Sequence, residues 1–240
     1  MPNDSSMILP GPDDRTLIIG RTGSGKSHLA LWMLSEVHQP DDVTIIIDFK
    51  RDTLIGQVPY TQDRTIFDDL PREPGMYRVQ PFPQQQKDIS DFLMRVWDTE
   101  NIRLFIDEGV MLAKNDALDN ILIQGRSKMI PVIMLTQRPV GISRFAFSES
   151  QIFVVFPSHD KRERKTINEF TPLFDNGDNR PVSLPPYHSY YYNVTTGDVL
   201  TLAPVPSIDK IMRTFEEKLR PVEPGEIVEP PRRLRRIVPI

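Results

Sequence analysis

Residues 20–27 read Gly-Arg-Thr-Gly-Ser-Gly-Lys-Ser, which matches the pattern G-x-x-x-x-G-K-[ST] without a mismatch. The glycines let the backbone curl so that successive N–H groups point toward a bound phosphate. We expect the ammonium of Lys26 to reach the β- and γ-phosphates of a nucleotide and the hydroxyl of Ser27 to bind Mg²⁺. The predicted nucleotide-binding set is Gly20, Arg21, Thr22, Gly23, Ser24, Gly25, Lys26, Ser27 and His28.

The flanking sequence supplies the elements that such a loop needs. Residues 16–20 form a short apolar run typical of a buried strand, and apolar residues recur through 29–37 as in a helix. A helix that starts near Lys26 would add its positive N-terminal end to the site. The alternative, a glycine turn with an accidental lysine, explains less of this context. The sequence therefore predicts a nucleoside-triphosphate site.

Two acids follow a second buried strand. Residues 103–107 read Arg-Leu-Phe-Ile-Asp, and Glu108 comes next. Ligands of an open parallel sheet bind at the carboxyl ends of its strands. We therefore expect Asp107 to support Mg²⁺ and Glu108 to activate a water in line with the γ-phosphate. The alternative is that both acids only cap the strand, but an adjacent pair of this kind favours hydrolysis.

A third strand, residues 132–136, ends in Thr136 and Gln137. The Gln137 side chain is a candidate sensor of the γ-phosphate or of the attacking water, although it could simply cap its strand. No N-K-x-D sequence follows that would read guanine, so ATP is the expected nucleotide.

Strand-like and helix-like segments alternate along the chain. Further apolar strand segments lie at 43–47, 76–79 and 152–156, and helical patterns lie at 84–98, near 117–128 and from about 158. This alternation predicts an α/β fold with a mostly parallel sheet flanked by helices. A small hairpin at 187–202 and a helix at 208–219 follow. Residues 52–75, with three prolines, predict no clear element.

In combination these motifs resemble one branch of P-loop ATPases. The loop at 20–27, Phe-Ile-Asp-Glu at 105–108, Gly-Arg-Ser-Lys at 125–128 and Thr-Gln-Arg-Pro at 136–139 are similar to the FtsK–HerA superfamily over roughly residues 15–170. The resemblance implies the RecA/FtsK-like arrangement, with an additional strand and a catalytic glutamate. In such relatives an arginine ahead of the sensor strand enters the site of the neighbouring subunit; the matching position is Arg126, with Arg138 and Arg144 as second choices.

The resemblance is strongest to the genome-packaging ATPases of tailless, membrane-containing double-stranded DNA phages (tectivirus-like). It implies an ATP-driven translocase of double-stranded DNA that forms a homo-oligomeric ring, a hexamer or pentamer, and meets proteins of a virion vertex. The expected location is the host cytoplasm, the virion, or both. Two alternatives stay open: a phage assembly or secretion ATPase of the zonula-occludens-toxin type, and a nucleotide-gated structural module at a vertex. A small-molecule kinase is disfavoured because no arginine-rich lid is evident.

Composition limits the remaining classes. The 240 residues are 39% hydrophobic and carry a net charge of -4, with 23 Pro and no Cys. The absence of Cys excludes a disulfide scaffold and thiolate chemistry, and no apolar stretch is long enough to predict a membrane span. The four scattered His predict no structural metal site. We expect an N-terminal arm at 1–14, an ATPase core at 15–175, a C-terminal hairpin and helix at 176–220 and a Pro/Arg-rich tail at 221–240.

Four features allow two interpretations each. Asp48 and Lys50 end a strand and could meet the site edge or only solvent. The basic run 161–165 is typical of a solvated helix face but could face DNA or a neighbouring subunit. Tyrosines 190–192 could stack on bases, although packing is the simpler explanation. The arginines of the tail could bind phosphates or lie in an inert segment.

Overall fold

The computed structural model describes residues 8–174 and 184–219, which contain a nine-stranded sheet. The strand order is β3-β4-β2-β5-β6-β1-β7-β8-β9; strands β1 to β7 run parallel, and β8 and β9 are antiparallel to their neighbours. The strands are β1 Arg15–Ile19, β2 Val43–Asp48, β3 Gln62–Arg64, β4 Gly75–Val79, β5 Ile102–Asp107, β6 Val132–Thr136, β7 Ile152–Val155, β8 Ser189–Asn193 and β9 Val199–Leu202.

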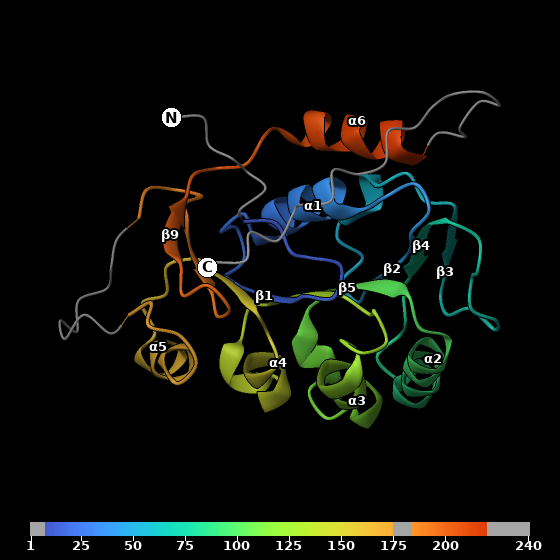
Figure 1. Ribbon diagram of the computed structural model, residues 1–240, viewed down its shortest axis with the longest axis horizontal. Helices are drawn as coiled ribbons and strands as arrows, with labels where there is room; N and C mark the ends of the chain where they lie inside the picture. Colours follow the sequence, from blue (N-terminus) through green and yellow to red (C-terminus); the bar gives the residue numbers. More distant parts are fainter. Residues whose placement is uncertain (1–7, 175–183, 220–240) are drawn as a thin grey trace, which may run out of the picture.

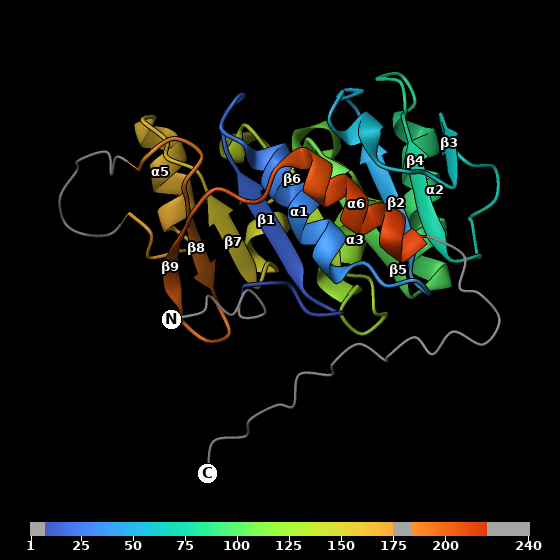
Figure 2. The same ribbon diagram turned by 90° about the horizontal axis from the view of Figure 1, so that it is seen from above.

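Helices cover both faces of this sheet. Helices α1 and α6 lie on one face and the other four on the opposite face (Figure 1), and α6 runs along α1 when the molecule is seen from above (Figure 2). The helices are α1 Lys26–Val37, α2 Gln86–Thr99, α3 Asp116–Gln124, α4 Arg144–Ser148, α5 Lys161–Asn168 and α6 Ile208–Leu219; short 3₁₀ turns cover Ile55–Gln57, Gly109–Leu112 and Pro139–Gly141.

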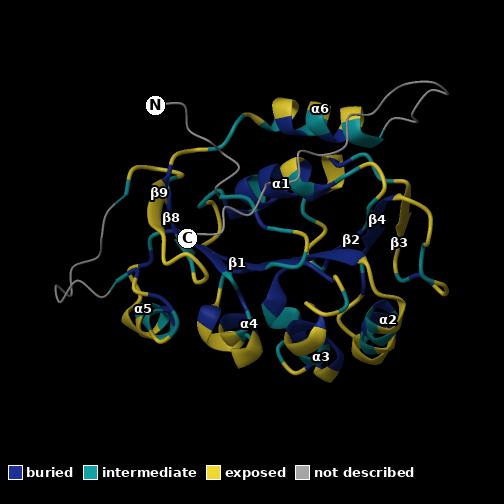
Figure 3. Ribbon diagram, viewed as in Figure 1, coloured by how far each residue is buried: buried dark blue, intermediate teal, exposed yellow. Residues whose placement is uncertain are grey.

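The central strands are buried on both faces, as their unbroken apolar runs predict (Figure 3). Alternate side chains enter two different cores. Leu17 of β1 packs with the layer of α2 to α4, whereas the next residue, Ile18, packs under α1 and α6. Strand β6 divides in the same way, with Met134 on the first side and Leu135 on the second. The sheet is therefore fixed from above and below.

The predicted α/β fold with a mostly parallel sheet is confirmed. The hairpin extends the sheet through β8, and α6 spans the range predicted for the last helix. The helix expected near 117–128 ends earlier, at Gln124, because Gly125 begins a series of turns that runs to Met129. Helix α4 was not anticipated; Ser143 caps its N-terminus, where the Ser143 hydroxyl accepts a hydrogen bond from the N–H of Phe145.

Several expected segments lie outside the described residues. These are most of the N-terminal arm, the stretch before the hairpin and the Pro/Arg-rich tail; in numbers, 1–7, 175–183 and 220–240. No helix among the described residues is long and apolar enough to cross a membrane.

Candidate active site

The predicted phosphate-binding loop connects the end of β1 to the start of α1. Gly25 has φ 97°, a left-handed conformation that glycine adopts without strain, and it directly precedes the first helical residue, Lys26. At Gly20 a side chain would lie 2.5 Å from Ser24 Oγ and 2.9 Å from a ring carbon of Phe156. The glycines therefore stand where the backbone must bend and where it is closely packed.

Lys26 is a buried cation at the base of this loop, 6% exposed. Burial lowers the pKa of its ammonium, and the nearby charge of Lys50 lowers it further. The hydroxyl of Ser24 is also buried, and in the part of the chain that the structure describes it has no hydrogen-bond partner. Polar groups that are buried without partners are rare in proteins. A bound phosphate is the kind of ligand that would satisfy both.

The strand order brings the predicted acids to the same edge of the sheet. Asp107 ends β5, two strands from β1, and it is fully buried. Neither of its carboxylate oxygens has a hydrogen-bond partner among the described residues. Burial raises the pKa of Asp107 to about 6. An uncompensated buried carboxylate fits the requirements of a divalent cation, so Asp107 is a suitable Mg²⁺ ligand here.

Glu108 has φ 71°, which is unusual for a residue with a side chain and which turns the chain sharply after β5. Its carboxylate accepts a hydrogen bond from the backbone N–H of Gln137 at 3.3 Å and forms an ion pair with Lys50. The Gln137 side-chain oxygen in turn accepts a 2.8 Å hydrogen bond from the Thr22 hydroxyl. The phosphate loop, the glutamate and the end of β6 therefore form one connected network.

Residues at the end of β2 and just after it complete this edge. The sequence alone did not decide whether they meet the site or only solvent. Asp48 lies beside Asp107 in register, but Arg78 binds its carboxylate at 2.5 and 3.1 Å, so it stabilises the fold of the loop. Lys50 is the residue that enters the site. The sequence signal for it is weak, because only the pairing of β2 with β5 brings it to Glu108.

A cavity of about 340 Å³ adjoins the phosphate loop. The segment 184–188 lines it opposite Phe156, and its Tyr187 is 60% exposed with φ 62°. A bulky residue held in the left-handed region is strained, and such strain is typical of functional sites. The hairpin prediction placed Tyr187 in a strand, so sequence reasoning missed this residue.

Two predicted site residues lie elsewhere. The ring of His28 forms a 2.8 Å hydrogen bond with the carbonyl of Pro206 ahead of α6. Arg126 lies in the turn before β6 and binds the carboxylate of Asp13 at 2.9 Å. Both Arg126 and Asp13 precede strands, so they are at the amino edge of the parallel sheet, opposite the phosphate loop of the same chain. Arg144, a second choice, pairs with Glu169 on the surface.

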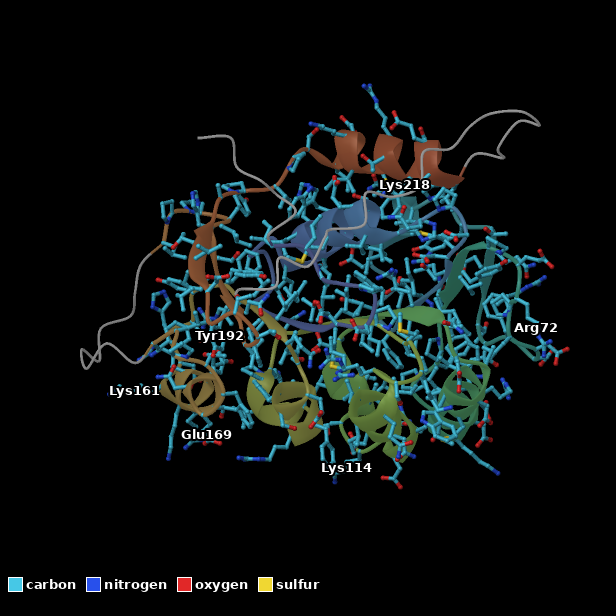
Figure 4. The ribbon with its side chains drawn as sticks, viewed as in Figure 1. Arg72, Lys114, Lys161, Glu169, Tyr192 and Lys218 are labelled. Atoms are coloured by element: carbon cyan, nitrogen blue, oxygen red, sulfur yellow. The ribbon has the colours of Figure 1, made fainter. Side chains whose placement is uncertain are left out.

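The tyrosines of β8 serve packing, because Tyr190 and Tyr191 are buried. In the basic run, Lys161 and Lys165 are exposed on α5, and Figure 4 shows Lys161 projecting from this helix on the outer side of the molecule.

The sequence is 34% identical over 217 residues to the DNA packaging ATPase P9 of Enterobacteria phage PRD1, and the match covers 87% of this chain and 94% of P9. The chain belongs to the family of viral DNA-packaging ATPases. This membership confirms the resemblance derived from the motifs, and it favours packaging over the secretion and structural alternatives. No family model matches the sequence.

Solved structures of other proteins share this fold. The genome packaging NTPase B204 of Sulfolobus turreted icosahedral virus 2, solved with AMPPCP, superposes with a TM-score of 0.65 over 82% of this chain and all of B204, at 19% identity. The ATPase domains 2 and 3 of EssC from Geobacillus thermodenitrificans give a TM-score of 0.58 at 16% identity, over 85% of this chain and 43% of EssC. These likenesses confirm the P-loop ATPase fold.

Proposed function

We propose that the chain hydrolyses ATP to move double-stranded DNA during genome packaging in the infected host cell. The observation that carries this proposal is a cluster at one edge of the sheet. It joins the phosphate loop, the buried Asp107, whose carboxylate has no hydrogen-bond partner among the described residues, and Glu108, whose carboxylate accepts the N–H of Gln137. The chain that carries this cluster is 34% identical to a DNA packaging ATPase. A module that only binds nucleotide would need no carboxylate placed to accept a proton from water.

The proposed roles follow from position. The ammonium of Lys26 and the N–H groups of residues 20–27 bind the phosphates, and Ser27 with Asp107 holds Mg²⁺. Mg²⁺ bound by these residues would offset the negative charge of the phosphates. Glu108 takes the proton of the attacking water, and the N–H of Gln137 orients that carboxylate. Through its bond to Thr22, the Gln137 side chain links the phosphate loop to the sensor strand.

The cavity beside the loop is proposed to accept the adenosine part of ATP. Its lining includes the aromatic rings of Phe156 and Tyr187, and flat rings are suited to stacking on a base. His28 is proposed to contact the nucleotide only through its backbone, because its ring is bonded to Pro206.

We further propose that the protein works as a homo-oligomeric ring, a hexamer or pentamer, anchored by proteins of a virion vertex. Arg126 supports a ring because it lies at the edge opposite its own phosphate loop. If it stabilises charge on a γ-phosphate, that phosphate belongs to a neighbouring subunit.

The test is the ATPase rate with and without linear double-stranded DNA, together with displacement of a triplex-forming oligonucleotide from that DNA. Wild type should be stimulated by DNA and should displace the oligonucleotide. Glu108→Gln should bind ATP but lose at least about a hundredfold in turnover, as expected for removal of a general base. Hydrolysis that ignores DNA and leaves the oligonucleotide in place would refute translocation.

A further inference from the structure

Lys50 is a second lysine at the active site, and its partner is the proposed catalytic glutamate. The ammonium of Lys50 forms an ion pair with one carboxylate oxygen of Glu108, while the other oxygen accepts the N–H of Gln137. Glu108 is buried, whereas the Lys50 side chain is 32% exposed. The glutamate is therefore held from two sides, and the lysine is the partner with room to move.

The loop that carries Lys50 is firmly built. The loop starts from Asp48, the last residue of β2, whose carboxylate accepts a hydrogen bond from the Arg78 guanidinium. Asp48 Oδ1 also accepts the N–H of Asp52 at 3.2 Å. The Asp52 carboxylate accepts the N–H of Leu54 at 2.7 Å. These bonds surround Lys50 in the sequence without involving its side chain. The backbone therefore presents Lys50 to the site, and only its flexible side chain has to rearrange.

The charge of Lys50 reaches the rest of the catalytic edge. It is the largest charge effect of a neighbour on both Lys26 and Asp107: it lowers the pKa of Lys26 in the same direction as burial does, and it lowers the pKa of Asp107 against the effect of burial. A triphosphate bound on Lys26 would bring its terminal phosphate into this same region. That phosphate carries more negative charge than a carboxylate and offers three acceptor oxygens, so it competes well for an ammonium.

We propose that Lys50 exchanges partners during the ATPase cycle. It holds Glu108 in the nucleotide-free site, and it moves to the γ-phosphate when ATP binds. The exchange releases one carboxylate oxygen of Glu108, which then accepts a proton from the attacking water. ADP lacks the γ-phosphate and leaves the ion pair in place. Lys50 thus makes activation of Glu108 depend on a bound triphosphate. This inference rests on the proposed role of Glu108.

The test compares two nucleotides on Lys50→Gln. Equilibrium binding of β,γ-methylene ATP and of ADP is measured by calorimetry with Mg²⁺ and without DNA. Loss of a charge-assisted contact to the γ-phosphate should weaken binding of the triphosphate analogue about tenfold or more, and ADP binding should change less than about twofold. Lys50→Arg, which keeps the charge, should restore most of the analogue affinity. Lys114→Gln, at an exposed lysine that no hydrogen bond or ion pair among the described residues connects to Lys50 or Glu108, is the control and should alter neither.

Two outcomes would overturn the exchange. Equal weakening of both nucleotides would mean that Lys50 acts on the whole site or on folding, which a thermal melt of the variant would report. Unchanged affinity for the analogue, with or without reduced turnover, would mean that Lys50 stays on Glu108 throughout. Because the measurement needs neither DNA nor turnover, its result is separate from that of the translocation test.

Discussion

Replacing Asp107 with asparagine should stabilise the nucleotide-free protein while abolishing its stabilisation by MgATP. Asp107 is fully buried, neither carboxylate oxygen has a hydrogen-bond partner within residues 8–174 and 184–219, and burial raises its pKa from 3.8 to about 6. An acid whose pKa is higher in the folded state binds its proton more tightly there than in the unfolded chain. Folded stability is therefore lost as the pH rises from about 4 to about 6, and the loss is complete above that range.

The size of the effect follows from these values. At about 1.4 kcal/mol per pKa unit, the charged form of Asp107 costs the fold about 3 kcal/mol near neutral pH. An asparagine removes the charge but still buries an amide without partners, which costs about 1–2 kcal/mol. The net gain should be about 1 kcal/mol, or a melting temperature about 2–4 °C higher for a domain of this size.

Thermal unfolding with EDTA at about pH 8 and again at about pH 4 is the assay. The variant should melt above wild type at the higher pH, and the advantage should disappear at the lower one, where wild type is protonated. Asp48→Asn is the matched control, since Asp48 is the register neighbour of Asp107 and equally buried but is bound to Arg78. It should lose about 3–5 kcal/mol, because the buried guanidinium of Arg78 loses its two shorter contacts and keeps only the 3.2 Å ion pair with the more exposed Asp63. An Asp107→Asn protein no more stable than wild type at either pH would refute the idea of an uncompensated charge.

Three further changes test other parts of the structure. In steady-state kinetics, Tyr187→Ala should raise KM for ATP about tenfold with kcat little changed, and Tyr187→Phe should behave as wild type. An unchanged KM in Tyr187→Ala would mean that the adenine base does not bind in this cavity. Lys218→Met should lower the free energy of unfolding by about 1–2 kcal/mol in a denaturant titration, because Lys218 of α6 (Figure 4) donates to carbonyls at the carboxyl end of α1 at 2.6 and 2.7 Å. Arg126→Ala and Glu108→Gln should each lack ATPase activity alone, yet a mixture of the two variants should regain it. In mixed rings, some interfaces unite an intact glutamate with an intact arginine. A mixture that stays inactive would argue against a role of Arg126 in the neighbouring site.

The residues that sequence reasoning found share one property: each is next to its own strand or helix. Asp107 and Gln137 end apolar runs, and Lys26 begins a helix directly after a glycine. A strand buried on both faces must place its first polar residue at the sheet edge, so a short stretch of sequence is enough to locate it. The same locality explains why the order of strands and helices could be predicted well.

The missed features depend on which strands are neighbours. Lys50 reaches Glu108 only because β2 pairs with β5, and Arg78 reaches Asp48 only because β4 pairs with β2. Consecutive strands along the chain are often not adjacent in this sheet, so spacing alone cannot reveal such pairs. Tyr187 is a similar case, since it meets the phosphate loop across a gap of more than 150 positions in the sequence.

The edge of the sheet at which a residue lies also decides whether it can act on the nucleotide of its own chain or only on that of a second subunit. The side chains proposed for phosphate binding, metal support and water activation all lie at the carboxyl edge of the parallel strands, and one chain supplies them together. Arg126 belongs to the amino edge, where Asp13 holds it. No rotation of its side chain could bring it around the sheet to its own γ-phosphate. A catalytic role for Arg126 therefore requires a neighbour whose carboxyl edge faces this amino edge, and a head-to-tail contact of that kind generates a ring when its rotation closes.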